Sequence, residues 1–134
     1  MEYRGRGMLT LTLPVAPSAN NAFINRKAGH GYGRIKSARY RNWVKQADAF
    51  YLLQGMSKFS PITEPYQCKM VFPRIRGDLD GRAKLILDWM VSRKLTPDDK
   101  HLRKLDTEID EGAGDLVWIA VWPWIIPAKS SDTP

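Results

Sequence analysis

Two short segments of the chain alternate apolar and polar residues with a period of two. Residues 9–13 read Leu-Thr-Leu-Thr-Leu and are followed by Pro14, and residues 66–72 place Tyr, Cys, Met and Phe at every second position. This period predicts two strands, each with one buried face. Residues 101–110 alternate weakly, which predicts an exposed strand. Residues 115–122 are apolar on both faces, which predicts a strand buried inside a sheet.

Two other segments repeat apolar residues every three or four positions, as amphipathic helices do. The first helix is expected after Ser37, a suitable N-terminal cap, and before Gly55, a suitable C-terminal stop. The second is expected from near Asp80 to Arg93 or Lys94. Its apolar stripe consists of Ala83, Ile86, Leu87, Met90 and Val91.

Residues 14–34, between the first strand and the first helix, are rich in Pro, Asn, Gly and Ser and show no sustained periodicity. They are predicted to form a long loop, and loops of this length are often functional. The order strand, helix, strand, helix, strand, strand predicts an α+β fold in which two main helices pack on a mixed β-sheet. We expect a single domain over residues 1–134, with flexible tails at about 1–7 and 125–134.

The composition of the chain indicates which class of partner it binds and in which cellular compartment it is expected. Lys and Arg number 21 against 14 Asp and Glu, which gives a net charge of +7. Such a charge favours a polyanionic partner, usually nucleic acid. Cys68 is the only cysteine, so neither an intrachain disulfide nor a cysteine-based zinc cluster can form. The sequence has no signal-peptide core and no apolar run of roughly 20 residues, so we expect a cytoplasmic protein with no membrane partner.

The stretch RGDLDGRAKLILDW, residues 76–89, places Asp78 and Asp80 at the start of the second predicted helix. A helix cap explains one of them, at about 1 kcal/mol of stability. Two like charges on an extended segment point the same way and repel, unless a cation lies between them. Oxygen ligands of this kind favour Mg²⁺ or Mn²⁺ over zinc.

Two further residues extend the acidic pair. Asp99 supplies a third carboxylate if the chain folds back, although Asp98–Asp99 beside Pro97 is also ordinary turn chemistry. Lys84 lies one helical turn beyond Asp80, where it either forms an exposed Asp–Lys pair or meets a phosphate or a water beside the metal. On a basic protein, this combination favours a metal-dependent nuclease over acids that only cap and turn.

The same residues resemble a known family. LTLPVAPSANNAF, GDLDGRAKLILDWMVSRKLTPDD and GAGDLVWIAVW, which lie within residues 9–122, resemble the opening, the central acidic block and the last strand of the RusA-type Holliday junction resolvases. The resemblance implies a RusA-like homodimeric endonuclease of bacteria or phages, associated with the nucleoid in recombination and repair. It would cut four-way DNA junctions with Mg²⁺, or Mn²⁺ as a substitute, and without an organic cofactor. Asp78, Asp80 and Asp99 would be the metal ligands, and together with Lys84 they would form the catalytic set.

The chain departs from the family pattern at two positions. Gly81 stands where the family usually has Asn, and Gly77 stands where it often has a basic residue. Arg74 and Arg76 lie close enough in the sequence to replace that basic DNA contact. Neither departure removes a predicted ligand.

Basic residues flank the acidic stretch and the long loop. The predicted DNA contacts are Lys27, Arg34, Lys36, Arg39, Arg74, Arg76 and Arg82. Phe23 and Tyr32 either stack on an unpaired base or pack in the protein. Two alternatives stay open: a non-catalytic DNA- or RNA-binding module, and a nuclease that acts on flaps, forks or plain duplex.

Overall fold

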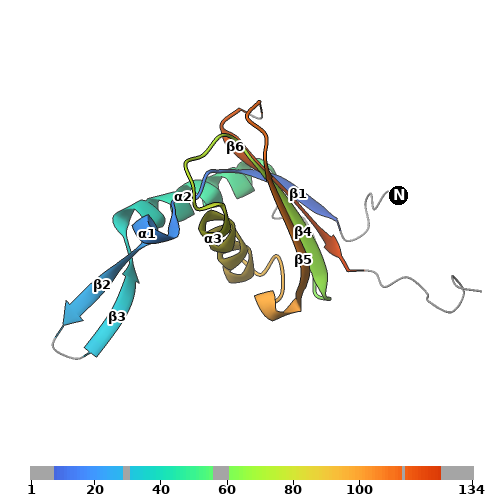
Figure 1. Cartoon of the computed structure of the whole chain (residues 1–134). Coiled ribbons are helices and arrows are strands. Elements are labelled where there is room, and N and C mark those ends of the chain that lie inside the picture. Colours follow the sequence, from blue (N-terminus) through green and yellow to red (C-terminus); the bar gives the residue numbers. More distant parts are fainter. Residues whose placement is uncertain (1–7, 29–30, 56–60, 113, 125–134) are drawn as a thin grey trace, which may run out of the picture.

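The computed structural model describes residues 8–28, 31–55, 61–112 and 114–124. In chain order the elements are β1 (Leu9–Pro14), α1 (Ala19–Ala22), β2 (Phe23–Ala28), β3 (Gly31–Lys36), α2 (Ala38–Leu53), β4 (Tyr66–Phe72), α3 (Leu79–Ser92), the 3₁₀ turn η2 (Asp99–His101), β5 (Leu102–Ile109) and β6 (Leu116–Pro123). Figure 1 shows the sheet on one side of the molecule, with α3 against it and the β2–β3 hairpin projecting away from it. The tails predicted at 1–7 and 125–134 lie outside the described residues.

Four strands form a mixed sheet in the order β1-β6-β4-β5. Strand β6 pairs antiparallel with both β1 and β4, whereas β5 runs parallel to β4. A parallel partner requires a long crossover, and α3 supplies it between β4 and β5. The predicted α+β class with a mixed sheet is therefore confirmed, in a small single domain.

The hydrophobic core lies between one face of this sheet and the helices. Alternate residues of β1 and β4 point inward, as the period of two predicted, and α3 buries its apolar stripe against them. The core cluster includes Leu9, Leu11, Leu13, Tyr66, Cys68, Met70, Phe72, Ala83, Ile86, Leu87, Met90, Val117, Ile119 and Val121. Burial raises the pKa of the Cys68 thiol to about 12, so this thiol stays protonated and unreactive at neutral pH.

Strand β6 occupies the predicted position inside the sheet, between β1 and β4. The prediction that both of its faces are buried is wrong for part of the strand. Val117, Ile119 and Val121 are buried, but Trp118 on the opposite face is 40% exposed. The second face of the sheet is partly open to solvent because the two main helices cover the first.

The prediction of a long loop over residues 14–34 is wrong. This segment contains α1 and most of a hairpin, in which β2 and β3 pair from Phe23 with Lys36 to Ala28 with Gly31. The hairpin projects from the body, and Ile24 and Ile35 remain 51% and 38% exposed. Residues 23–28 and 31–36 show no sustained alternation of apolar and polar residues, so periodicity did not reveal the pairing.

The ends of the two main helices agree with the sequence signals. The Ser37 hydroxyl accepts a hydrogen bond from the Tyr40 backbone N–H at 3.1 Å, and Gly55 takes the left-handed conformation that favours glycine. Helix α3 runs from Leu79 to Ser92, within a residue or two of the predicted bounds.

A polar clamp joins α2 to α3 beside the core. The Asp48 carboxylate accepts a hydrogen bond from Trp89 Nε1 at 2.9 Å and two from the Arg93 guanidinium at 2.6 Å. The Arg93 hydrogen bond holds the pKa of Asp48 below its ordinary value, so this carboxylate stays charged through the neutral range. Trp89 is 2% exposed, which identifies it as a core residue and not as part of an exposed face.

Among the residues that the structure describes, none of the helices combines the length and the hydropathy required to cross a lipid bilayer.

Candidate acidic site on helix α3

Asp78 caps helix α3 and also connects it to α1. Its backbone is left-handed, with φ 53°, and follows Gly77 at φ 60°. Its side chain accepts hydrogen bonds from the backbone N–H of Gly81 at 3.2 Å and of Ala19 at 2.5 Å. The prediction that Asp78 and Asp80 leave an extended segment on the same side is therefore wrong, because Asp78 is left-handed and Asp80 already lies in the helix.

Gly81 is required by the position of the Asp78 carboxylate. A Cβ at position 81 would lie 2.5 Å from each Asp78 carboxylate oxygen, far closer than van der Waals contact. An Asn at position 81, as in the family pattern, cannot coexist with this orientation of Asp78. The two features of the sequence, a capping Asp and a Gly three residues later, are thus one structural unit.

Asp80 lies in the first turn of α3, where the helix dipole favours a negative charge. Its side chain is exposed and forms no hydrogen bond or ion pair within the described part of the chain. The exposed pair with Lys84, one of the two roles expected for that lysine, is not formed. Asp80 therefore presents both carboxylate oxygens to solvent.

Lys84 holds together two acids from different parts of the chain. Its ammonium group lies 2.6 Å from Asp99 Oδ2 and 3.2 Å from Asp88 Oδ1. The chain does fold back, so that Asp99 at the start of η2 contacts the middle of α3. The sequence reasoning missed Asp88, although the four-residue spacing of Asp80, Lys84 and Asp88 places all three on one face of the helix.

These contacts determine the charge of Lys84. The hydrogen bond to Asp99 raises the pKa of Lys84, and the same bond lowers the pKa of Asp99. Lys84 therefore stays protonated throughout the neutral range. It can stabilise negative charge there, but it cannot take up a proton as a general base.

An aromatic contact connects the face of α3 that carries Lys84 and Asp88 to the base of the β2–β3 hairpin. Tyr40 of α2 is 4% exposed, and its pKa is raised by burial and by the nearby Asp88 carboxylate. The ammonium group of Lys36, the last residue of β3, lies 5.1 Å from the centre of the Tyr40 ring. Phe23, the first residue of β2, packs edge-to-face on the same ring, with 5.3 Å between ring centres.

The predicted metal ligands are not gathered into one group. No set of three or more His, Cys, Asp or Glu side chains in the described ranges is placed to hold a metal ion together. Asp78 and Asp80 lie at the start of α3, whereas Asp99 is paired with Lys84 one turn further along. Mg²⁺ is nevertheless often held by only one or two carboxylates, with water and substrate phosphate filling its shell. The exposed carboxylates of Asp78 and Asp80 fit that donor chemistry.

Six of the seven predicted DNA contacts fall into three groups. Arg74 and Arg76 are exposed between β4 and α3, as Lys36 is at the hairpin base. The Arg82 guanidinium is partly buried and donates to the backbone carbonyls of Ala16, Gly77 and Arg76. It therefore fastens the start of α3 to neighbouring loops. The side chains of Lys27 and Arg34, like that of Tyr32, lie outside the described part of the structure.

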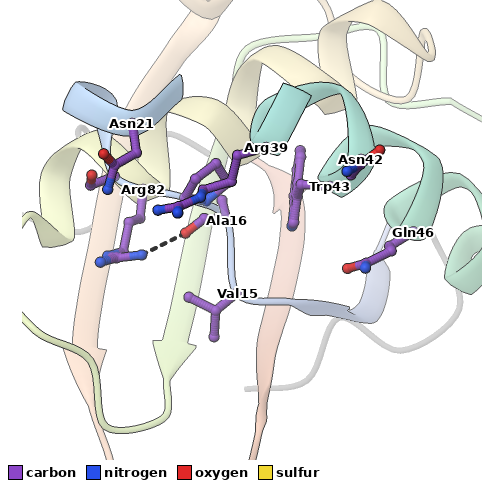
Figure 2. Close-up of a pocket in the computed structure, with 10 residues that line it drawn as sticks. Val15, Ala16, Asn21, Arg39, Asn42, Trp43, Gln46 and Arg82 are labelled. Atoms are coloured by element: carbon purple, nitrogen blue, oxygen red, sulfur yellow. Dashed lines mark hydrogen bonds between the residues drawn. The ribbon is translucent and has the colours of Figure 1, made fainter. Parts of the chain in front are cut away.

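Arg39 lines a pocket of about 520 Å³ beside the acidic site. Figure 2 shows that its wall is built from the segment after β1, from α1, and from one face of α2, with Arg82 opposite. The lining residues are Val15, Ala16, Pro17, Ser18, Asn21, Arg39, Asn42, Trp43, Gln46 and Arg82.

Neither protein-family models nor curated protein sequences give a significant match to this chain. The chemistry of the site residues is therefore the basis of the functional proposal.

Proposed function

We propose that the chain is a divalent-metal-dependent endodeoxyribonuclease that cuts branched DNA, with the four-way junction as its substrate. The observation that carries the proposal is the start of α3, where the exposed residues Asp78 and Asp80 are followed one turn later by Lys84. Two exposed carboxylates, of which Asp78 also accepts two backbone N–H groups, lie one turn from an ion-paired ammonium group, on a chain of net charge +7. Carboxylates exposed to solvent on a basic protein have a clear use if a cation joins them to a phosphodiester.

Asp78 and Asp80 would hold the ion, Mg²⁺ or Mn²⁺, at the start of α3. Each Asp78 oxygen accepts one backbone N–H, which fixes the carboxylate and leaves a lone pair on each oxygen. Asp80 forms no competing contact with described residues. When bound, the ion would polarise the phosphoryl oxygen and help to generate a hydroxide nucleophile.

Lys84 would stabilise the negative charge that develops on the phosphate. An ammonium group has three N–H donors, and Asp88 and Asp99 accept two of them. The third remains available for a phosphate oxygen. Because the two acids hold the ammonium in place and keep it charged, little reorganisation is needed in the transition state.

The resemblance to RusA-type resolvases supports a symmetric assembly. A four-way junction has near two-fold symmetry, and paired nicks need two matched active sites. A homodimer with one acidic site per subunit would supply them. This role is consistent with action on DNA in the cytoplasm of a bacterium or in a phage-infected cell.

The proposal is tested with synthetic four-way junction, replication fork and linear duplex of the same sequence. We expect symmetric nicking of the junction in Mg²⁺ and in Mn²⁺, none in EDTA, and slower cleavage of the fork and the duplex. Preferential cutting of the fork would change the substrate but keep the nuclease.

A second candidate function is a non-catalytic nucleic-acid-binding module. It is favoured because two of the predicted metal ligands have structural roles. Asp78 caps α3 and Asp99 pairs with Lys84, so neither needs a metal to explain its position. This alternative predicts salt-sensitive binding of DNA with no nicking in any divalent ion.

A further inference from the structure

The pocket beside α3 combines an apolar floor with an open polar rim. Val15, Pro17 and Trp43 supply the apolar surface, and the Trp43 ring is held in place because its Nε1 donates to the Pro14 carbonyl at 2.9 Å. At about 520 Å³, the pocket falls within the size range of small-molecule sites, roughly 300–1,000 Å³.

Three exposed polar side chains of α2 line the rim of the pocket. Arg39, Asn42 and Gln46 follow one another along one face of α2, at spacings of three and four residues, and all are exposed. None of the three forms a side-chain hydrogen bond or ion pair with another residue that the structure describes. Asn21 and Ser18 also line the pocket, and the Ser18 hydroxyl does not cap α1. Figure 2 shows Arg39 and Arg82 extending toward the same region.

The chemistry of the lining selects a ligand with a negative charge and a planar polar edge. The pocket contains two guanidinium groups and no carboxylate. Arg82 is fixed by three backbone carbonyls, whereas Arg39 is free to form paired hydrogen bonds with a phosphate. Asn and Gln side chains each carry a donor and an acceptor, the combination that recognises the edge of a base, adenine above all.

The pocket adjoins the acidic site directly. The Asp78 carboxylate accepts from the N–H of Ala19, which lies between the lining residues Ser18 and Asn21. Arg82 follows Asp78 by one helical turn. A DNA strand with one nucleotide bound in the pocket would therefore pass close to the start of α3.

We propose that this pocket binds one unpaired nucleotide of the DNA substrate, with its phosphate on Arg39 and its base edge against Asn42 and Gln46. The inference rests on the proposed function in taking DNA as the substrate. It adds a nucleotide subsite to the acidic site. At a branch point, where bases are partly unstacked, insertion of one nucleotide costs less than it does in continuous duplex. The subsite would thus favour branched over linear DNA.

The test is a titration of the full chain in EDTA, followed by the side-chain NH₂ signals of Asn and Gln in ¹⁵N-correlated NMR spectra. The probes are deoxyadenosine 5′-monophosphate, deoxyadenosine and inorganic phosphate. We expect saturable shifts of the Asn21, Asn42 and Gln46 signals, with the nucleotide binding more tightly than either part alone. Arg39→Gln should weaken nucleotide binding about tenfold or more, as expected for loss of a charge-assisted hydrogen bond.

Lys45→Gln is the matched control, since it removes one positive charge from an exposed position of the same helix that does not line the pocket. The affinity of this variant should stay within about twofold of the wild type, because Lys45 does not line the pocket and an exposed charge is screened by salt. Equal losses in the two variants, or an absence of saturable shifts at the three amides, would overturn the subsite. Because no metal or cleavage is involved, that failure is distinct from failure of the nuclease proposal, which the junction assay decides.

Discussion

Asp80→Asn is expected to abolish metal-dependent cleavage of a four-way junction while binding of the junction survives. The amide keeps the size of the side chain but removes the charge that would attract the ion. Loss of residues that only orient metal ligands costs about 10–100-fold, so loss of a ligand should exceed about 100-fold. Binding, measured in EDTA, should be unchanged or slightly tighter, because one negative charge facing the DNA backbone is gone.

Asp106→Asn provides the control for this experiment. Asp106 is exposed on the edge strand β5, which is not part of the acidic face of α3. Its replacement makes the same change of charge and should leave cleavage within about twofold of the wild type, as expected for a screened surface charge. Wild-type rates for Asp80→Asn would show that Asp80 does not bind the catalytic ion.

Trp89→Ala should produce the largest loss of stability, about 3–5 kcal/mol of unfolding free energy. The ring is 2% exposed and packs edge-to-face on Tyr51, with 5.8 Å between ring centres. Truncation leaves a cavity between α2 and α3 and removes one of the hydrogen bonds to Asp48. The midpoint of urea denaturation, followed by far-UV circular dichroism, measures the loss.

Trp118→Ala is the comparison for that measurement. It removes the same side chain from the open face of the sheet, where the ring is 40% exposed. We expect a loss well below that of Trp89→Ala, because less apolar surface returns to water. Equal losses at the two positions would mean that Trp89 does not hold the two helices together.

The elements that bury one face could be predicted from the sequence. Alternation in residues 9–13 and 66–72 and the helical stripe of α3 each gave the correct element, because burial imposes a period on apolar residues. The sequence of the β2–β3 hairpin shows no such alternation, so its hydrophobic pattern did not indicate the pairing. The partial exposure of Trp118 was also missed, since which face of β6 is covered depends on how the helices are placed.

The candidate site was predictable in its local parts only. Asp78 as a helix cap follows from the preference of Asp for that position. The left-handed turn at Gly77 and Asp78, and the need for Gly81 beside the carboxylate, depend on backbone geometry that a sequence pattern does not contain. The contact of Asp99 with Lys84 joins residues 15 positions apart, and no spacing rule gives its partner. Arg82 was predicted to contact DNA, yet tertiary contacts occupy much of its guanidinium.

The most direct measurement of the central claim is the binding of Mn²⁺ to the chain without DNA. Substoichiometric Mn²⁺ broadens the NMR signals of amides close to the ion. Ion binding at the start of α3 predicts loss of the signals of residues 77–84 and of Ala19, which donates to Asp78. EDTA should restore these signals, and Asp80→Asn should prevent the broadening. Broadening confined to other acidic residues, or none at millimolar Mn²⁺, would contradict a metal site on α3.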